Sequence, residues 1–154
     1  MPTFQAILTA PAGRFAVVAA RFNKEIVDKL VAGARDALQR QGVADDAIDL
    51  VWVSGSYELP LVAQRLAASK KYVAVICLGA VIKGDTDHYE YVCRAATDGI
   101  LQAGLATGVP VLFGVLTCQT EEQALDRVGG KEGNKGADVA LAALEMVNLL
   151  KQLP

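Results

Sequence analysis

The chain alternates between short apolar runs rich in β-branched residues and longer segments in which apolar residues recur every three or four positions. The short runs predict strands at 15–20, 48–53, 73–78 and 111–116, and a weaker strand at 4–8. The central runs are continuously apolar and do not alternate with polar residues. This pattern is typical of strands that are buried on both faces of a parallel sheet.

The segments between these runs predict helices. After the first strand, residues at three- and four-residue spacing form one apolar face: Ile26, Val27, Leu30, Val31, Ala34 and Leu38. Further helices are predicted over 58–68, 88–106, about 121–127 and about 135–152. Pro60 lies near the start of the first of these, as is common for proline. Asp87 has the spacing from Glu90 to cap the helix that begins at His88.

Strands and helices therefore alternate along the chain in the order β-α-β-α-β-α-β-α. This order predicts an α/β fold, a three-layer α/β/α sandwich with a central parallel sheet, right-handed crossovers and helices on both faces. The length of 154 residues suits one hydrophobic core, and no repeat or linker divides the chain. We therefore expect one domain over residues 1–154.

The last predicted helix carries its polar residues on one narrow stripe, at Asp138, Glu145, Asn148 and Gln152. Such a wide remaining apolar arc usually faces more than one neighbour. The helix lies either deep in its own domain or at a subunit interface, and the short chain favours the interface. An apolar content of 53% and a mean hydropathy of +0.31 also favour a homo-oligomer.

Charge and cysteine content argue against several function classes. The net charge is −2 and neither sign is clustered, so neither a nucleic-acid groove nor a membrane-binding face is indicated. No apolar run approaches the ~18 residues of a membrane helix. The first residues lack the pattern of a signal peptide, so we expect a cytoplasmic protein. Cys77, Cys93 and Cys118 are far apart and are expected to be reduced core thiols.

Ligands of open parallel sheets bind beyond the carboxyl ends of the strands. Four polar or glycine-bearing loops follow the predicted strands, at 21–23, 54–58, 83–88 and 117–120. His88, the only histidine, lies in the third loop at the start of a helix. Its imidazole can accept and donate a proton near neutral pH. A lone histidine is more often structural, but this position favours a catalytic role.

The loop before His88 carries a modest signal for phosphate. Gly84 allows close approach of the backbone, and Thr86 adds a hydroxyl before a helix N-terminus. Asp85 and Asp87 oppose this interpretation because carboxylates repel phosphate. A phosphate site here therefore needs a cation from another segment.

Two cations follow the fourth strand. Arg127 ends a short helix, where the helix dipole favours a cation, so helix stability alone also explains it. Lys135 opens the last helix, where a cation opposes the dipole by ~0.3–1 kcal/mol, and it is the better functional candidate. Phe22 either stacks on a planar heterocycle or folds onto the core. Glu58 either accepts hydrogen bonds from a polyol or simply starts its helix.

Several common motifs are absent. Residues 129–136, GGKEGNKG, lack the Gly-Lys-Ser/Thr ending of a P-loop and follow a helix instead of a strand. No GxGxxG follows a strand, which argues against a dinucleotide site. With one histidine, neither a Ser/His/Asp triad nor a metal-spaced cluster is apparent.

Four segments in register resemble lumazine synthases: RFN at 21–23, GSYELP at 55–60, LGAVIKGDTDHYEYV at 78–92 and GVLTCQTEEQALDRVGGKEGNKG at 114–136. The resemblance implies a flavodoxin-like fold and homopentamers with active sites between adjacent subunits. It implies a transferase of riboflavin biosynthesis that uses no metal and no organic cofactor. The reaction condenses 5-amino-6-(D-ribitylamino)uracil with 3,4-dihydroxy-2-butanone 4-phosphate, giving 6,7-dimethyl-8-ribityllumazine, phosphate and water.

The resemblance also implies a role for each candidate residue. His88 would relay protons, and Phe22 would stack on the pyrimidine. The remaining contacts to the ribitylamino substrate would come from Ser56, Tyr57, Glu58, Ala80, Val81 and Ile82. The phosphate-bearing ketone would be held by Gly84, Asp85 and Thr86. The neighbouring subunit would add Phe113, Arg127 on the phosphate, and Lys135.

Some positions depart from the family pattern. Asp87 stands where a small residue or proline is common, Tyr57 and Tyr89 where phenylalanine is common, and Cys118 where threonine is common. None of these changes removes a proposed catalytic group. The alternatives are a non-catalytic flavin or lumazine carrier, a structural shell protein with a vestigial site, and a low-activity or regulatory paralogue. The first two would not need a histidine relay or a phosphate-binding arginine, so the enzyme is favoured.

The glycine-rich stretch GGKEGN at 129–134 resembles members of the family that build an icosahedral shell from twelve pentamers. Such a shell can enclose riboflavin synthase as a partner enzyme. We take the shell as a hypothesis, with a free pentamer and a decamer as the alternatives.

Overall fold

The computed structural model describes residues 1–154 and contains a four-stranded sheet, a two-stranded hairpin and five α-helices. In chain order the main elements are β1 (Arg14–Ala20), α1 (Lys24–Arg40), β2 (Ile48–Val53), α2 (Leu59–Ala68), β3 (Tyr72–Ile82), α3 (His88–Thr107), β4 (Val111–Cys118), α4 (Glu121–Asp126) and α5 (Lys135–Leu150). Short 3-10 turns precede β2 at Asp45–Ala47 and α2 at Ser56–Glu58. The hairpin, β5 (Val128–Gly130) and β6 (Gly133–Asn134), was not predicted.

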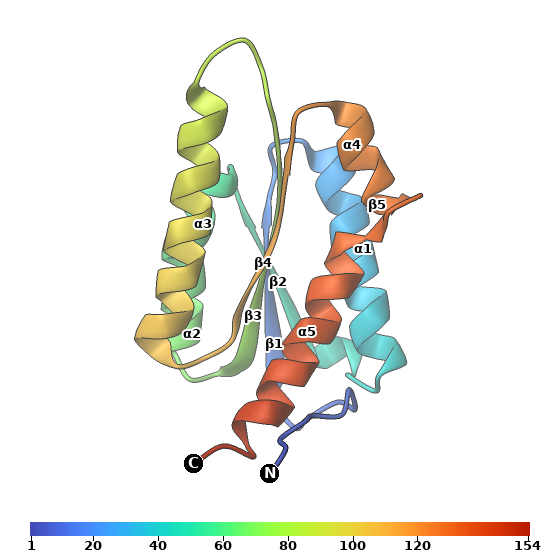
Figure 1. Ribbon diagram of the computed structural model, residues 1–154, viewed down its shortest axis with the longest axis vertical. Coiled ribbons are helices and arrows are strands. Elements are labelled where there is room, and N and C mark those ends of the chain that lie inside the picture. Colours follow the sequence, from blue (N-terminus) through green and yellow to red (C-terminus); the bar gives the residue numbers. More distant parts are fainter.

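The four main strands are parallel and lie in the order β2-β1-β3-β4. Helices α2 and α3 cover one face of this sheet, and α1 and α5 cover the other (Figure 1). Two separate clusters of 23 and 12 buried apolar residues fill the spaces on the two faces. This arrangement confirms the predicted three-layer α/β/α sandwich, which is flavodoxin-like.

Helix α5 packs mainly inside its own domain. Its buried residues contact α1 and the sheet, and they are Gly136, Val139, Ala140, Ala143, Leu144 and Val147. At Gly136 the two helices approach so closely that a Cβ would overlap the carbonyl of Leu30. Assigning most of the apolar arc to a subunit interface was therefore wrong, although Met146 and Leu150 remain exposed.

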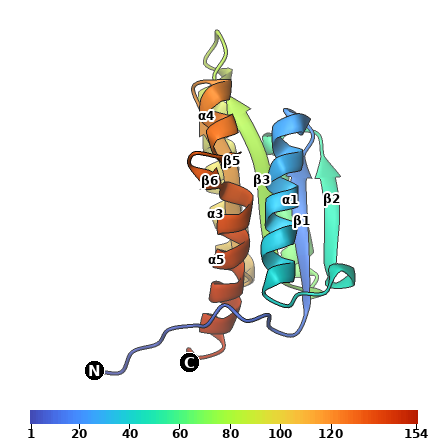
Figure 2. The same ribbon diagram turned by 90° about the vertical axis from the view of Figure 1, so that its right-hand side faces the viewer.

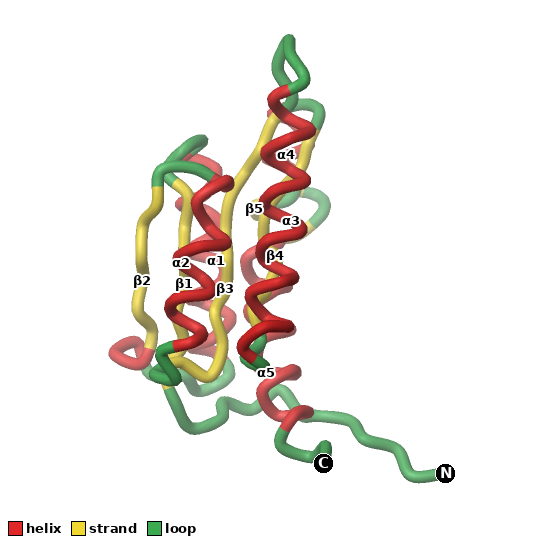
Figure 3. Tube along the Cα trace, turned by 90° about the vertical axis from the view of Figure 1, so that its left-hand side faces the viewer, coloured by secondary structure: helices red, strands yellow, loops and turns green.

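The predicted strand at 4–8 is absent, because this segment has no strand partner within the chain. It runs as an extended loop along the end of α5 (Figures 2 and 3). The side chain of Asn148 donates hydrogen bonds to the carbonyls of Ile7 and Thr9, both at 2.8 Å, and Gln152 donates to that of Gln5 at 3.2 Å. Asn148 of α5 and Gln152 just beyond its end therefore hold the N-terminal segment.

Two further details differ from expectation. The side chain of Asp87 makes no capping hydrogen bond to α3, so the predicted cap is wrong. Strand β3 continues four residues beyond the predicted end, from Gly79 to Ile82. No helix is both long and apolar enough to cross a membrane.

Polar side chains at the amino end of the sheet bond to one another. A guanidinium nitrogen of Arg14 on β1 lies 2.6 Å from Asp49 Oδ1 on β2, and the hydroxyl of Tyr72 on β3 donates to Asp49 Oδ2 at 2.7 Å. The hydrogen bonds from Arg14 and Tyr72 lower the pKa of Asp49. Bonding to the same carboxylate raises the pKa of Tyr72. This cluster ties three neighbouring strands together.

Candidate active site

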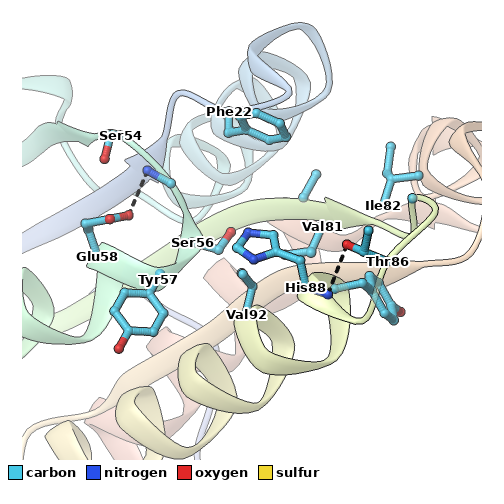
Figure 4. A pocket seen from close by; sticks show the side chains of 14 residues that line it. Phe22, Ser54, Ser56, Tyr57, Glu58, Val81, Ile82, Thr86, His88 and Val92 are labelled. Carbon is cyan, nitrogen blue, oxygen red and sulfur yellow. Dashed lines mark hydrogen bonds between the residues drawn. The ribbon is translucent and has the colours of Figure 1, made fainter.

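A cavity of about 640 Å³ opens at the carboxyl end of the sheet (Figure 4). Its walls come from the segments that follow β1 and β2, the last residues of β3 and the first turn of α3. The residues that line it are Phe22, Ser54, Gly55, Ser56, Tyr57, Glu58, Ala80, Val81, Ile82, Gly84, Thr86, His88, Tyr89 and Val92. This is the edge where ligands of such sheets bind.

Phe22 lies on the α1 side of the opening, whereas Tyr57 and His88 lie on the α3 side (Figure 4). The Phe22 side chain is 71% exposed, so it does not fold back onto the core. Backbone bonds from Arg21 to Val53 (2.8 Å) and from Phe22 to Ser54 (3.0 Å) carry the β1 backbone past the end of the strand. The aromatic ring is therefore available to stack on a planar ligand.

Ser56 is the only buried polar residue, with 5% of its surface exposed. It packs against Gly79 of β3, where a Cβ would overlap the Ser56 hydroxyl. This hydroxyl makes no hydrogen bond to the other residues drawn in Figure 4 and has no partner elsewhere in the chain, yet no fully enclosed side-chain polar atom lacks a partner. Its oxygen therefore reaches the cavity and can bond to a ligand.

Glu58 has an exposed carboxylate with one oxygen in use. Its Oε2 accepts a hydrogen bond from the backbone N–H of Gly55 at 3.1 Å. This bond holds the carboxylate at the rim of the cavity, and the other oxygen remains available to hydroxyl donors. Glu58 thus both stabilises the turn before α2 and offers an acceptor to a ligand.

His88 is the first residue of α3, and its exposed side chain lines the cavity. The hydroxyl of Thr86 accepts a long hydrogen bond of 3.4 Å from the backbone N–H of His88. Gly84 and Thr86 line the cavity beside it, whereas Asp85 does not. The glycine-bearing loop and the side chain of His88, at the N-terminus of α3, therefore line one cavity.

Comparison with known proteins agrees with this geometry. A family model described as 6,7-dimethyl-8-ribityllumazine synthase matches residues 12–151. A protein of Desulfotalea psychrophila named 6,7-dimethyl-8-ribityllumazine synthase is 56% identical over 154 residues, covering 99% of each chain. This chain belongs to the 6,7-dimethyl-8-ribityllumazine synthase family. It is an enzyme, a transferase of riboflavin biosynthesis.

Three residues assigned by resemblance to lumazine synthases do not line the cavity of their own chain: Phe113, Arg127 and Lys135. Arg127 follows α4, and its guanidinium donates to the carbonyl of Gln123 at 2.9 Å. Lys135 is the exposed first residue of α5, and the side chain of Asn134 caps that helix by accepting from Ala137 N–H at 3.1 Å.

The sequence of this chain did not identify four of the lining residues as candidates for the site. Ser54 and Gly55 lie in a loop that was predicted to face the ligand. Tyr89 lies in the first turn of α3, and Val92 follows His88 by four residues, one turn further along, which places His88 and Val92 on one helix face. Burial raises the pKa of Tyr89. Helical spacing from His88 was a signal that could have identified Val92.

The cysteines have the environment expected of core thiols in this lumazine synthase family member. Cys77 and Cys118 are buried, Cys93 is half-buried, and all three are free. Burial raises the pKa of Cys77 to about 12 and also raises the pKa of Cys93 and of Cys118. The thiols therefore stay protonated and are poor nucleophiles. No group of three or more His, Cys, Asp or Glu side chains is arranged to hold a metal ion.

Proposed function

We propose that this cavity is the active site in which 5-amino-6-(D-ribitylamino)uracil condenses with 3,4-dihydroxy-2-butanone 4-phosphate. The products are 6,7-dimethyl-8-ribityllumazine, phosphate and two molecules of water. One observation carries the proposal: the only histidine of a chain of this family lines the same cavity as the exposed aromatic residue Phe22 and as Ser56, whose hydroxyl has no partner in the chain.

The pyrimidine substrate would occupy the side of the cavity between β1 and β3. The ring of Phe22 would stack on the heterocycle, which its 71% exposure allows. The ribityl chain would extend along the segment after β2, where the hydroxyl of Ser56 and the carboxylate of Glu58 can bond to its hydroxyls. Tyr57 would cover the chain, and Ala80, Val81 and Ile82 would offer apolar surface and backbone groups.

The ketone would bind at the loop before α3. Backbone N–H groups from Gly84 to Thr86 would donate to its phosphate, and Asp85 is not among the residues that line the cavity. The one cation of this loop, Lys83, does not line the cavity, so a cation from elsewhere would have to balance the phosphate charge. Arg127 of an adjacent subunit would do so through charge-assisted hydrogen bonds.

We further propose a homopentamer in which Phe113, Arg127 and Lys135 complete the cavity of the neighbouring subunit. Large apolar side chains on the outer faces of α2 and α3 support a homo-oligomer, because Leu61, Leu101 and Leu105 are 79%, 61% and 76% exposed. The pentamer as such rests on the family resemblance. Sedimentation at a mass below five chains would contradict it.

The association of twelve pentamers into a shell around riboflavin synthase is proposed on resemblance alone. Residues 129–134 form the exposed part of the hairpin β5–β6, which could contact a neighbouring pentamer. Analytical ultracentrifugation distinguishes the alternatives, because a pentamer, a decamer and a sixty-chain shell differ widely in mass. A single peak at pentamer mass would contradict the shell.

The reaction needs positioning and proton transfer more than a protein nucleophile. The amine of the pyrimidine attacks the ketone carbonyl, and water leaves to give an imine. Phosphate is then eliminated, and attack of the second amine closes the ring with loss of a second water. His88 can transfer protons in several of these steps. Holding two substrates together contributes up to ~7–11 kcal/mol in well-oriented systems.

Lumazine absorbance after mixing both substrates with the protein tests the proposal. Arg127→Ala should reduce the rate by at least about a hundredfold, because the departing phosphate loses its counter-charge. His88→Ala should lower the rate less, by up to about a hundredfold, since water can replace part of the relay.

Arg40→Ala is the matched control, because Arg40 lies in the last turn of α1 and pairs only with Asp36. It should leave the rate unchanged. If the folded, oligomeric parent formed no product above the uncatalysed background, the proposed enzymatic function would be wrong. A non-catalytic flavin or lumazine carrier would then be the better interpretation.

A further inference from the structure

Asn23 has an unusual backbone conformation between the cavity residue Phe22 and helix α1. With φ 59° and ψ 43° it is left-handed, and Lys70 is the only other residue besides glycine with a positive φ. Asparagine tolerates this region better than most residues, but it remains disfavoured over ordinary helical or extended backbone. Contacts of Asn23 must therefore stabilise the conformation.

The side chain of Asn23 does not do what its position predicts. An asparagine at a helix N-cap usually accepts a hydrogen bond from an amide of the first turn. Here only the Asn23 backbone carbonyl does so, accepting from Ile26 and Val27 at 3.0 and 3.1 Å. Its side-chain amide instead donates to the carbonyl of Ala80 on β3, 57 residues away, at 2.8 Å.

This bond lies where the sheet loses a strand. The pairing of β1 with β3 ends at Ala19 and Leu78, while β3 continues to Ile82 along β4. The Asn23 amide bonds to β3 on the flank that β1 has left. The loop that carries Phe22 is thus tied to one cavity wall through Ser54 and to the other through Ala80.

We infer that Asn23 is a positioning residue, whose amide bond to Ala80 sets the distance between the Phe22 ring and the edge of β3. A flat heterocycle stacked on Phe22 has to fit in that space. The inference rests on the proposed function, in which the heterocycle is the pyrimidine substrate. Asn23 then acts through Phe22 and need not touch the substrate itself.

Two variants separate the backbone conformation from the amide bond. Asn23→Gly keeps the left-handed backbone, which glycine adopts freely, and removes only the bond to Ala80. Asn23→Asp keeps the shape but brings a carboxylate oxygen against the Ala80 carbonyl, so the loop is pushed away from β3. The KM for the pyrimidine should rise about tenfold in Asn23→Gly and further in Asn23→Asp. The KM for the ketone phosphate should stay unchanged, and kcat should fall less than the pyrimidine KM rises.

Lys70→Gly is the matched control. Lys70 has nearly the same backbone conformation, with φ 60°, but it is exposed, makes no side-chain hydrogen bond and does not line the cavity. Both glycine variants should unfold at similar urea concentrations. Only Asn23→Gly should change the KM for the pyrimidine.

The outcomes are distinct. A selective rise of the pyrimidine KM in the Asn23 variants supports the inference. Unchanged constants, an equal rise of both KM values, or the same change in Lys70→Gly would overturn it while the parent enzyme still makes lumazine. Absence of lumazine with the parent enzyme would instead overturn the proposed function.

Discussion

At the amino end of the sheet, polar side chains from three neighbouring strands bond to one another: Arg14 and Tyr72 both bond to Asp49. At the carboxyl end, the hydroxyl of Ser56 reaches the cavity without a partner in the chain, and Phe22 and Tyr57 are 71% and 63% exposed. The two ends belong to the same strands, yet one satisfies its own polar groups and the other leaves them for a ligand.

This difference separates stability from activity. Polar groups that pair within the chain contribute to folding and have nothing left for a substrate. Polar groups that reach the cavity without a partner in the chain contribute little to folding, because water can bond to them in the free protein, but they can make hydrogen bonds to a substrate. Substitutions at the carboxyl end should therefore change substrate binding, and substitutions at the amino end should change only stability. The four predictions below test this division.

The largest effect is expected for Gly79→Ala, which adds a Cβ where the hydroxyl of Ser56 lies. The overlap should destabilise the fold by about 1–3 kcal/mol, as overpacking commonly does, and distort the cavity wall. Urea unfolding measures the loss. In the double variant Gly79→Ala with Ser56→Ala, most of the stability should return, because the new Cβ would lie 3.5 Å from the Ser56 Cβ. Equal instability of single and double variants would contradict this account.

Ser56→Ala alone should change substrate binding and leave the stability of the fold nearly unchanged. Because its hydroxyl has no partner in the chain, the free energy of unfolding should change by no more than about 0.5 kcal/mol. The KM for the ribitylamino substrate should rise about three- to tenfold through loss of one hydrogen bond. Steady-state kinetics with each substrate varied in turn gives both constants. A large loss of stability would mean that the hydroxyl does bond within the chain.

Tyr72→Phe tests the amino end. It removes the hydroxyl that donates to Asp49 at 2.7 Å, so the free energy of unfolding should fall by at most about 1 kcal/mol, since the carboxylate is partly hydrated. Activity should be unchanged, because Tyr72 lies at the opposite end of β3 from the cavity. A changed KM for either substrate would break the division between the two ends.

The smallest expected effect is a shift in acid stability. Hydrogen bonds from Arg14 and Tyr72 lower the pKa of Asp49 below its ordinary value of 3.8. Its stabilising contribution is therefore complete above that pH and is lost as the pH falls through the lower pKa of the folded state. The parent should be more stable than Asp49→Asn near neutral pH, and the difference should shrink below about pH 4. Urea unfolding at several pH values measures this difference in the free energy of unfolding. A difference that stays constant into acid would contradict the role of the Asp49 carboxylate.

Much of the fold followed from sequence because it depends on local patterns. Continuous apolar runs gave the four parallel strands, and three- and four-residue spacing gave the buried face of α1. The segment at 4–8 has the composition of a strand, but its partner is the side chain of Asn148 on α5, more than a hundred residues away. Pattern alone does not identify such a partner.

The candidate site was predictable where a loop follows a strand. The rule for parallel sheets and the family resemblance identified the loops that carry Phe22, Ser56 and His88, which line one cavity. Neither could identify the extension of β3 past the end of β1, because strand length depends on pairing with β4. The hydrogen bond from Asn23 to Ala80 depends on that extension, so it could not be predicted from the sequence either.

The one-sided end of β3 also has a consequence for amide hydrogen exchange. From Gly79 to Ile82, β3 pairs with β4 on one flank and with no strand on the other. Amides that point to the open flank should exchange quickly in the free enzyme, since water reaches them without any opening of the sheet. A ligand seated against that flank would slow them. The sheet thus contains a short run of amides whose exchange reports occupancy of the cavity without an added label.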